Sequence, residues 1–193
     1  MQRLILMLLV FSVCITKGSF KSCPKLPVQR NFTLSEFMGM WYEIEALHPH
    51  SDKGSCITHK FAETSALWIS VNTTEKRDDE KRILYIGELF VARLNETANL
   101  KIRFQHGIHM EFFYSDNSDK FEFIPFQILA SDYKSYSLVY SCTQHSLSPT
   151  IYAWILSRHA QLEESIIEQL KNILISHEIN INKMETVDQV NCP

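Results

Sequence analysis

A series of short strand-like segments occupies most of the sequence and limits the folds open to it. These segments are rich in Val, Ile, Tyr, Phe and Thr, and polar turn residues separate them. The predicted strands are 41–47, 56–61, 67–73, 83–91, 100–104, 110–114, 121–130, 135–142 and 150–156. No helical pattern lies between them, so the sequence predicts an antiparallel sandwich or barrel rather than βαβ units.

One amphipathic helix is predicted after the strands, at residues 162–177. Glu163 and Glu164 fall in its first turn, where acidic side chains suit the helix dipole. Its apolar residues recur at helical spacing. They are Leu162, Ile166, Ile167, Leu170, Ile173 and Leu174. We expect this helix to cover part of the outside of the sheet, and residues 184–187 to form a final short strand.

The first residues of the chain predict export. Arg3 precedes an apolar run at residues 4–15, which is shorter than the roughly 20 residues that a membrane span needs. We therefore expect residues 1–19 to be a signal peptide, with cleavage somewhere within 18–22. The glycosylation motifs at Asn31, Asn72 and Asn95 agree with a secreted glycoprotein.

Cysteine usage points to the same extracellular environment. Without the signal peptide an even number of cysteines remains, which is typical of disulfide-bonded exported proteins. They are Cys23, Cys56, Cys142 and Cys192. Four cysteines allow three pairings, and their spacing alone does not choose between these pairings.

Several function classes are disfavoured by the sequence. The formal net charge is −3, and loss of Arg3 and Lys17 with the signal peptide makes it −5, so nucleic acid is not an expected partner. The close histidine pairs 48/50 and 106/109 have no zinc-site context, so no metal is expected. No nucleophile-elbow motif occurs, and paired cysteines are not nucleophiles. We expect neither an enzyme nor a bound cofactor.

Three short motifs, in order along the chain, carry a resemblance to a known family. They are Gly39-Met40-Trp41, Ser131-Asp132-Tyr133 and Arg158 after the last predicted barrel strand. Together they resemble the signatures of the lipocalins. The resemblance implies a single domain at residues 23–193, folded as an eight-stranded antiparallel up-and-down β-barrel with one C-terminal helix outside. A barrel of that size has room for side chains or for one small ligand.

The family resemblance also implies disulfides and partners. The pairs would be Cys23 with Cys142 and Cys56 with Cys192, each closing a loop of more than 100 residues and worth on the order of 4–5 kcal/mol in the loop-entropy model. The ligand would be a small hydrophobic molecule such as a fatty acid, a steroid, a retinoid or a bilin, carried without catalysis. Further partners implied by the resemblance are a lipoprotein or membrane surface, contacted peripherally, and a cell-surface receptor.

The resemblance places Trp41 and Arg158 at the closed end of the barrel. A guanidinium on an indole face is worth about 0.5–2 kcal/mol. Trp154 lies four residues before Arg158 and Tyr152 six, so on a regular strand all three face the same side. Trp154 is therefore the first candidate for a ligand contact, with core filling as the alternative.

The other candidate ligand contacts are aromatic residues on predicted strands, Tyr140, Phe61 and Phe104. Burial under the outer helix is an equal alternative for each of them. Asn72 is either a polar cavity residue or a glycan carrier. A competing function is a secreted interaction protein whose barrel is filled by its own side chains and which acts through an extended hairpin at residues 105–127.

Overall fold

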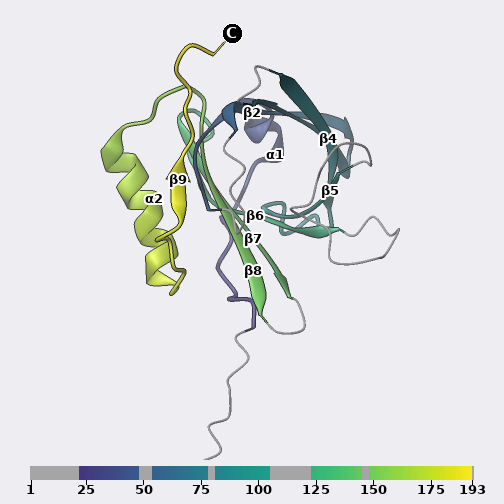
Figure 1. Cartoon of the computed structure of the whole chain (residues 1–193). Helices are drawn as coiled ribbons and strands as arrows, with labels where there is room; N and C mark the ends of the chain where they lie inside the picture. The colour runs from purple at the N-terminus through teal and green to yellow at the C-terminus, as the bar shows by residue number, and fades with distance from the viewer. Residues whose placement is uncertain (1–21, 48–53, 78–80, 105–122, 145–147, 193) are drawn as a thin grey trace, which may run out of the picture.

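The computed structural model describes residues 22–47, 54–77, 81–104, 123–144 and 148–192. Within them lie two helices and nine strands, shown in Figure 1. In chain order they are α1 (Leu34–Phe37), β1 (Gly39–Leu47), β2 (Ser55–Ser65), β3 (Trp68–Lys76), β4 (Arg82–Val91), β5 (Asn99–Phe104), β6 (Ile124–Ser131), β7 (Tyr136–Gln144), β8 (Pro149–Ser157), α2 (Glu164–Ser176) and β9 (Met184–Thr186).

The first eight strands form a closed antiparallel barrel. Each strand from β2 to β8 pairs with its neighbour in sequence, and β1 pairs with both β8 and β2, which closes the sheet. This confirms the predicted barrel and its exterior C-terminal helix. The predicted strand at 110–114 lies outside the described residues, as do most of the proposed hairpin and the histidine pairs 48/50 and 106/109.

The strand β1 has different partners on its two edges. One edge pairs with β8 as far as Leu47, with a bulge between Glu43 and Glu45. On the other edge Gly39 to Tyr42 pair with β2, and Glu45 to Leu47 pair with β9. The predicted final strand is therefore confirmed. It continues the sheet where β1 and β2 diverge.

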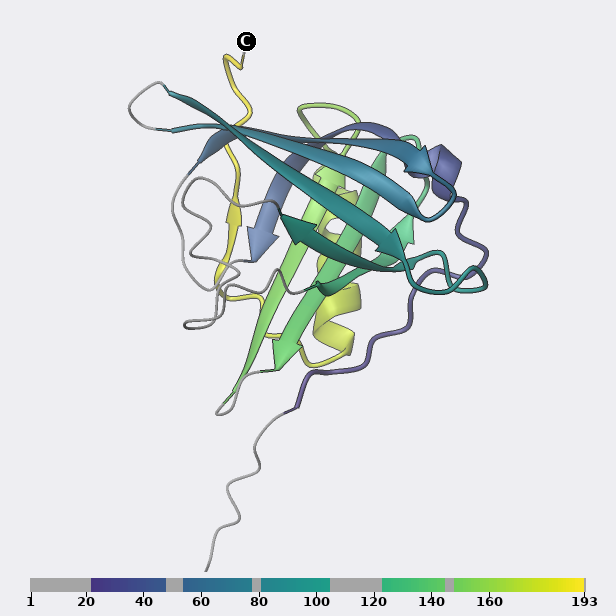
Figure 2. The same ribbon diagram turned by 90° about the vertical axis from the view of Figure 1, so that its right-hand side faces the viewer.

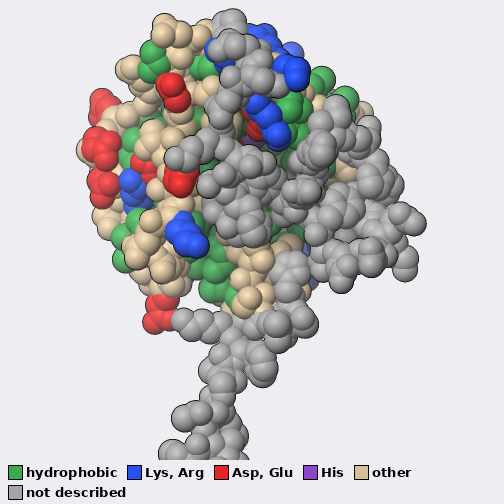
Figure 3. Space-filling view, viewed as in Figure 1, with side chains coloured by type: hydrophobic (Ala, Val, Ile, Leu, Met, Phe, Trp, Pro, Cys, Tyr) green, Lys and Arg blue, Asp and Glu red, His purple; other side chains and the backbone are tan. Residues whose placement is uncertain are grey.

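The sheet separates two hydrophobic clusters. One fills the inside of the barrel and includes Trp41, Phe61 and Leu156. The other lies outside, where Ile167, Leu170 and Leu174 of α2 pack on β1, β7 and β8. Figure 2 shows α2 behind the sheet, and Figure 3 shows acidic side chains along the solvent-facing side of this helix. The predicted apolar and charged faces of the helix are confirmed.

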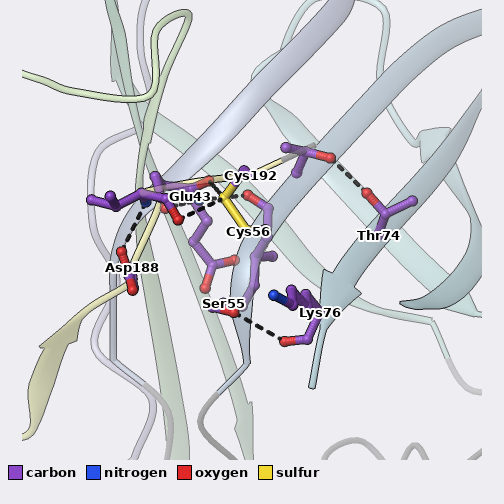
Figure 4. Close-up of a disulfide and its surroundings, with 11 residues drawn as sticks. Glu43, Ser55, Cys56, Thr74, Lys76, Asp188 and Cys192 are labelled. Atoms are coloured by element: carbon purple, nitrogen blue, oxygen red, sulfur yellow. Dashed lines mark hydrogen bonds between the residues drawn. A yellow bond between two sulfur atoms is a disulfide. The ribbon is translucent and has the colours of Figure 1, made fainter. Parts of the chain in front are cut away.

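Two disulfides tie the chain ends to the barrel, and they are the pairs that the family resemblance implies. Cys23 is bonded to Cys142 on β7, and Cys56 on β2 is bonded to Cys192 in the C-terminal tail (Figure 4). Around the second disulfide, the Cys56 amide donates to the Asp188 carbonyl, and Gln189 donates to the carbonyls of Glu43 and Ile57. The tail therefore bridges the gap between β1 and β2.

Candidate functional site in the barrel interior

A cationic side chain on an indole ring closes one end of the barrel. The Arg158 guanidinium carbon lies 3.7 Å from the centre of the Trp41 ring, and the Trp41 indole donates to the Phe37 carbonyl at 2.8 Å. Trp41 and Phe37 have no solvent-exposed surface, and their rings stack at 5.2 Å. This is the cation–π contact predicted from the sequence, and it seals the end of the barrel next to α1.

Arg158 also binds the loop that leads into the barrel. Its guanidinium donates to the carbonyls of Met40 at 2.8 Å and Met38 at 2.9 Å, and to those of Glu36, Phe37 and Tyr133. Burial lowers the pKa of Arg158, and the charge of Asp132 acts in the opposite direction. The donors of Arg158 are thus directed at backbone carbonyls, as the predicted structural role at the barrel floor requires.

Gly39 is required by the same arrangement. Its φ is +99°, a backbone conformation that side-chain-bearing residues rarely adopt, and a Cβ there would lie 3.3 Å from an Arg158 guanidinium nitrogen. The glycine of the Gly39-Met40-Trp41 motif therefore allows both this backbone conformation and the close approach of Arg158.

The interior near this floor is tightly packed. Its inward-facing side chains are less than 3 % exposed. They include Phe61, Ile69, Val71, Leu89, Leu100, Ile128 and Leu156. Phe61 contacts Phe37 at 5.0 Å and Phe126 at 6.1 Å between ring centres. The predicted ligand contact Phe61 is thus inward-facing but belongs to this packed layer.

An aromatic wall lies further from the floor, on β6 and β8. The rings of Tyr152 and Trp154 are nearly parallel at 5.9 Å, and Trp154 also stacks on Phe126 at 6.3 Å. Burial raises the pKa of Tyr152 to about 12. Trp154 is only half-buried although β7 and β1 flank its strand and α2 covers the outer face. Its exposed surface therefore faces the barrel interior.

Phe104 occupies the inner side of β5 above a glycine. It lies opposite Gly87 and packs against the inner cluster while staying half-buried. A Cβ at Gly87 would lie 2.8 Å from the Phe104 ring, so the glycine makes room for this ring. The predicted candidate is therefore placed on the inside wall.

Tyr140 is placed on the other side of the sheet, so its prediction as a ligand contact is wrong. It belongs to the outer cluster under α2, and its hydroxyl donates to the Pro24 carbonyl at 3.3 Å. Asn72 also faces outward and is exposed, as are Asn31 and Asn95. This outward orientation shows that Asn72 is not a polar residue of the cavity.

A polar chain of three side chains lines the interior on β1, β2 and β3, beside the strand that carries Tyr152 and Trp154. His59 Nε2 lies 2.8 Å from a Glu43 carboxylate oxygen, and His59 Nδ1 lies 2.8 Å from the Thr73 hydroxyl. The strand registers pair Trp41 with His59 and His59 with Thr73, so both face inward like Trp41. Glu43 is 2 % exposed, whereas His59 and Thr73 are half-buried.

A second polar group follows on β3 and β4. The Tyr85 hydroxyl donates to Glu75 at 2.8 Å, and Arg77 contacts both residues. Burial raises the pKa of Tyr85, and the hydrogen bond to Glu75 adds to this shift. The hydrogen bond to Glu75 likewise raises the pKa of Arg77. The interior therefore has an aromatic wall and a polar wall.

The polar wall is the part of the site that the sequence analysis missed. A signal was present, because Glu43 is two residues from Trp41 and so shares its side of the strand. The inward position of His59 follows only from the register between β1 and β2, which the sequence does not specify.

The described residues contain no group of three histidine, cysteine or acidic side chains arranged to hold a metal ion. In that same part of the chain, no helix has the length and apolar character to cross a membrane.

Comparison with known proteins agrees with this architecture. The family model for the lipocalin / cytosolic fatty-acid binding protein family matches residues 38–191. Apolipoprotein D of Cavia porcellus is 34% identical over 200 residues, covering 100% of this chain and 97% of that protein. Apolipoprotein D of Rattus norvegicus is 37% identical over 175 residues, covering 89% and 84%.

Solved structures show the same fold. Insecticyanin from the tobacco hornworm Manduca sexta superposes with a TM-score of 0.70 at 26% identity, covering 88% of this chain and 87% of that one. Apocrustacyanin C2 gives a TM-score of 0.64 at 18% identity over 81% and 79% of the two chains.

Proposed function

The chain belongs to the lipocalin family, and from this premise we propose that it is a secreted carrier of a small hydrophobic molecule. The ligand occupies the barrel between the aromatic wall and the polar wall, and the protein performs no chemistry on it. Fatty acids, steroids, retinoids and bilins are the ligand classes to test. The proposed function requires no metal or cofactor.

The main support for this function is the contrast in solvent exposure between the two ends of the barrel interior. Near the floor the inward-facing side chains are almost fully buried, whereas Trp154, Phe104 and His59 keep exposed surface on the inner side of the barrel. A partly exposed aromatic side chain inside a closed barrel is typical of a binding site rather than of a finished core.

The size of the expected affinity follows from the apolar area that a ligand can bury. About 300 Å² of apolar surface at ~25 cal/mol per Å² gives roughly 7–8 kcal/mol before the costs of association. We therefore expect dissociation constants around the micromolar range.

Tryptophan fluorescence tests the proposal directly. Trp154 lies inside the barrel, while Trp68 lies in another aromatic group with Phe90, Phe123 and Arg103. We expect saturable quenching by at least one ligand class in the wild-type protein and in Trp68→Phe, and its loss in Trp154→Phe. Absence of saturable quenching by all four classes in the wild-type protein contradicts the carrier proposal.

Secretion is the second part of the proposal. It is supported by the two disulfides and by the exposure of Asn31, Asn72 and Asn95 at the surface. Expression of the full chain in secreting animal cells should yield protein in the medium that begins within residues 19–23 and loses mass on deglycosylation. Retention of the intact N-terminus inside the cells contradicts it.

A further inference from the structure

The buried carboxylate of Glu43 limits the charge that the barrel interior can accept. Glu43 lies opposite Leu156 of the inner cluster, and its side chain is 3% exposed. A buried carboxylate is stable only with a polar partner, which His59 supplies at 2.8 Å. A second carboxylate placed in the same interior would be repelled by Glu43 and would lose its water shell as well.

The direction of the hydrogen bonds also selects the ligand. An imidazole with one proton that donates from Nε2 to Glu43 must accept at Nδ1. With His59 in this neutral tautomer, Thr73 donates its hydroxyl proton to Nδ1, which leaves the Thr73 oxygen as an acceptor at the end of the chain. Thr73 is half-buried, so a group inside the barrel can reach this oxygen. A hydroxyl can donate to it, whereas an ionised carboxylate has no proton to donate.

A second polar atom on the inner side of the barrel calls for a polar partner. Ser141 lies opposite Tyr152 on β7, between Tyr140 and Cys142 of the outer cluster, so it faces inward. It is fully buried, and its hydroxyl has no hydrogen-bond partner within the described part of the chain. Such an atom costs free energy unless another polar group reaches it. A small hydroxyl meets this need without bringing charge into the interior.

The cation of the polar wall does not reverse this selection. Among the described residues of that wall the cation is Arg77, and it is already bonded to Glu75 and Tyr85. The charge of Arg77 is therefore already compensated before a ligand enters. A bound carboxylate would instead require a cation whose charge is not yet compensated.

We propose that the barrel prefers apolar molecules with a neutral hydroxyl head, such as long-chain or sterol alcohols, over the corresponding carboxylates. The Glu43–His59–Thr73 chain receives the hydroxyl, and the aromatic wall holds the apolar body. This inference rests on the proposed carrier function and names the ligand class within it.

A pair of ligands that differ only in the head group tests the inference. 1-Dodecanol and dodecanoate are titrated at pH 7.4 against tryptophan fluorescence in the full secreted protein. We expect dodecanol to bind at least about tenfold more tightly. Repulsion from a single charge at short range in a protein interior costs more free energy than a tenfold change in affinity represents. In Glu43→Gln the preference should fall to about threefold or less, mainly through tighter dodecanoate binding.

Glu45→Gln is the matched control. It lies two residues from Glu43 on the same strand and is also buried, but it contacts Lys171 of α2 on the outside of the barrel. We expect it to leave the preference for dodecanol unchanged.

Thr73→Val is a second variant that does not depend on the folding of Glu43→Gln. It keeps the shape of a half-buried side chain and removes the hydroxyl, which is both the partner of His59 Nδ1 and the terminal acceptor. Dodecanol affinity should fall about three- to tenfold, the range for one hydrogen bond, while dodecanoate affinity stays unchanged.

The outcomes separate the two proposals. If neither ligand binds and no other apolar molecule quenches Trp154, the carrier function itself is wrong. If both ligands bind with equal affinity, or dodecanoate binds more tightly, the carrier function stands and the preference for alcohols is overturned. An unchanged dodecanol affinity in Thr73→Val also overturns it.

Discussion

At the scale of single residues, Arg158 shows how one side chain can make many contacts at once. Its planar guanidinium stacks on Trp41 and reaches carbonyls on two separate loops, including Met38 and Tyr133. Lysine has the same charge but neither the plane nor the fork of donors. The geometry of this cation therefore matters more than its charge.

The first prediction concerns replacement of this side chain. Arg158→Lys should lower the free energy of unfolding by about 2–4 kcal/mol, because several partly buried carbonyls lose their donor and Trp41 loses its stacking partner. Urea unfolding measures the change. Arg93→Lys is the control, since Arg93 is about two-thirds exposed and pairs with Glu96, and it should cost less than about 1 kcal/mol. Equal losses in both variants contradict the structural role of Arg158.

Asp132 carries the second prediction, which concerns pH. Burial alone would raise its pKa, but hydrogen bonds from the amides of Tyr136, Ser135 and Lys134 outweigh this and lower the pKa. A lowered folded-state pKa means that stability is present above the ordinary aspartate range and is lost as pH falls through the folded-state value.

The matching experiment compares the wild-type protein with Asp132→Asn. Asparagine keeps one acceptor oxygen but cannot titrate, so the variant should be less stable at pH 7 and the difference should shrink as the pH falls below 4. Urea unfolding at several pH values measures it. A difference that stays constant down to pH 2.5 shows that Asp132 is not the titrating group.

At the scale of elements, the register of β1 decides which residues face the ligand. Simple alternation in 41–47 suggests one apolar face made of Tyr42, Ile44 and Ala46. In the structure, the bulge between Glu43 and Glu45 leaves Tyr42 and Ile44 outside and turns Ala46 inward. Of the two glutamates of β1, Glu45 consequently contacts the helix and Glu43 points into the barrel.

This bulge explains what the sequence could and could not predict. Strand identity, the helix and the pair Trp41 and Arg158 follow from local patterns and short motifs. Trp154 follows from its regular spacing to Arg158 on one strand. The polar wall combines residues of four strands, and Tyr140 required knowledge of which face of β7 meets α2. Neither register nor bulge position has a local sequence signal, so these parts remained hidden.

The helix contributes the third prediction through its ion pair with β1. Lys171 Nζ lies 2.9 Å from Glu45, and both side chains are less than one-fifth exposed. Burial opposes the charge of Lys171, but the bond to Glu45 outweighs this and raises its pKa. Removing one partner of such a pair leaves a buried charge alone.

Lys171→Met should therefore lower the free energy of unfolding by about 2–3 kcal/mol. The double variant Lys171→Met/Glu45→Gln should recover at least half of this loss, because no uncompensated charge remains. Chemical denaturation at pH 7 measures both. A double variant less stable than Lys171→Met shows that the helix is held by packing alone.

At the scale of the whole molecule, the barrel divides its interior between stability and binding. In the floor layer, large side chains such as Trp41, Phe61 and Leu156 are almost fully buried, as in a protein core. Toward the other end the same strands present rings and polar groups that keep exposed surface. One continuous sheet therefore supplies both a core and a site.

The fourth prediction follows from this division. Leu89 has no exposed surface and belongs to the packed layer, so Leu89→Ala should cost about 2–5 kcal/mol of unfolding free energy. Ligand affinity of the folded variant should stay within about twofold. Trp154→Ala should show the opposite, with at least a tenfold loss of affinity and a smaller loss of stability, because the side chain is only half-buried.

The two variants decide the point only when measured together. Thermal unfolding without ligand gives stability, and displacement of a fluorescent apolar probe gives affinity without depending on Trp154. If Leu89→Ala loses ligand affinity at temperatures where it is fully folded, the floor layer belongs to the site. If Trp154→Ala loses as much stability as Leu89→Ala while affinity is kept, the aromatic wall is core. Either result places the boundary between core and site elsewhere along the barrel.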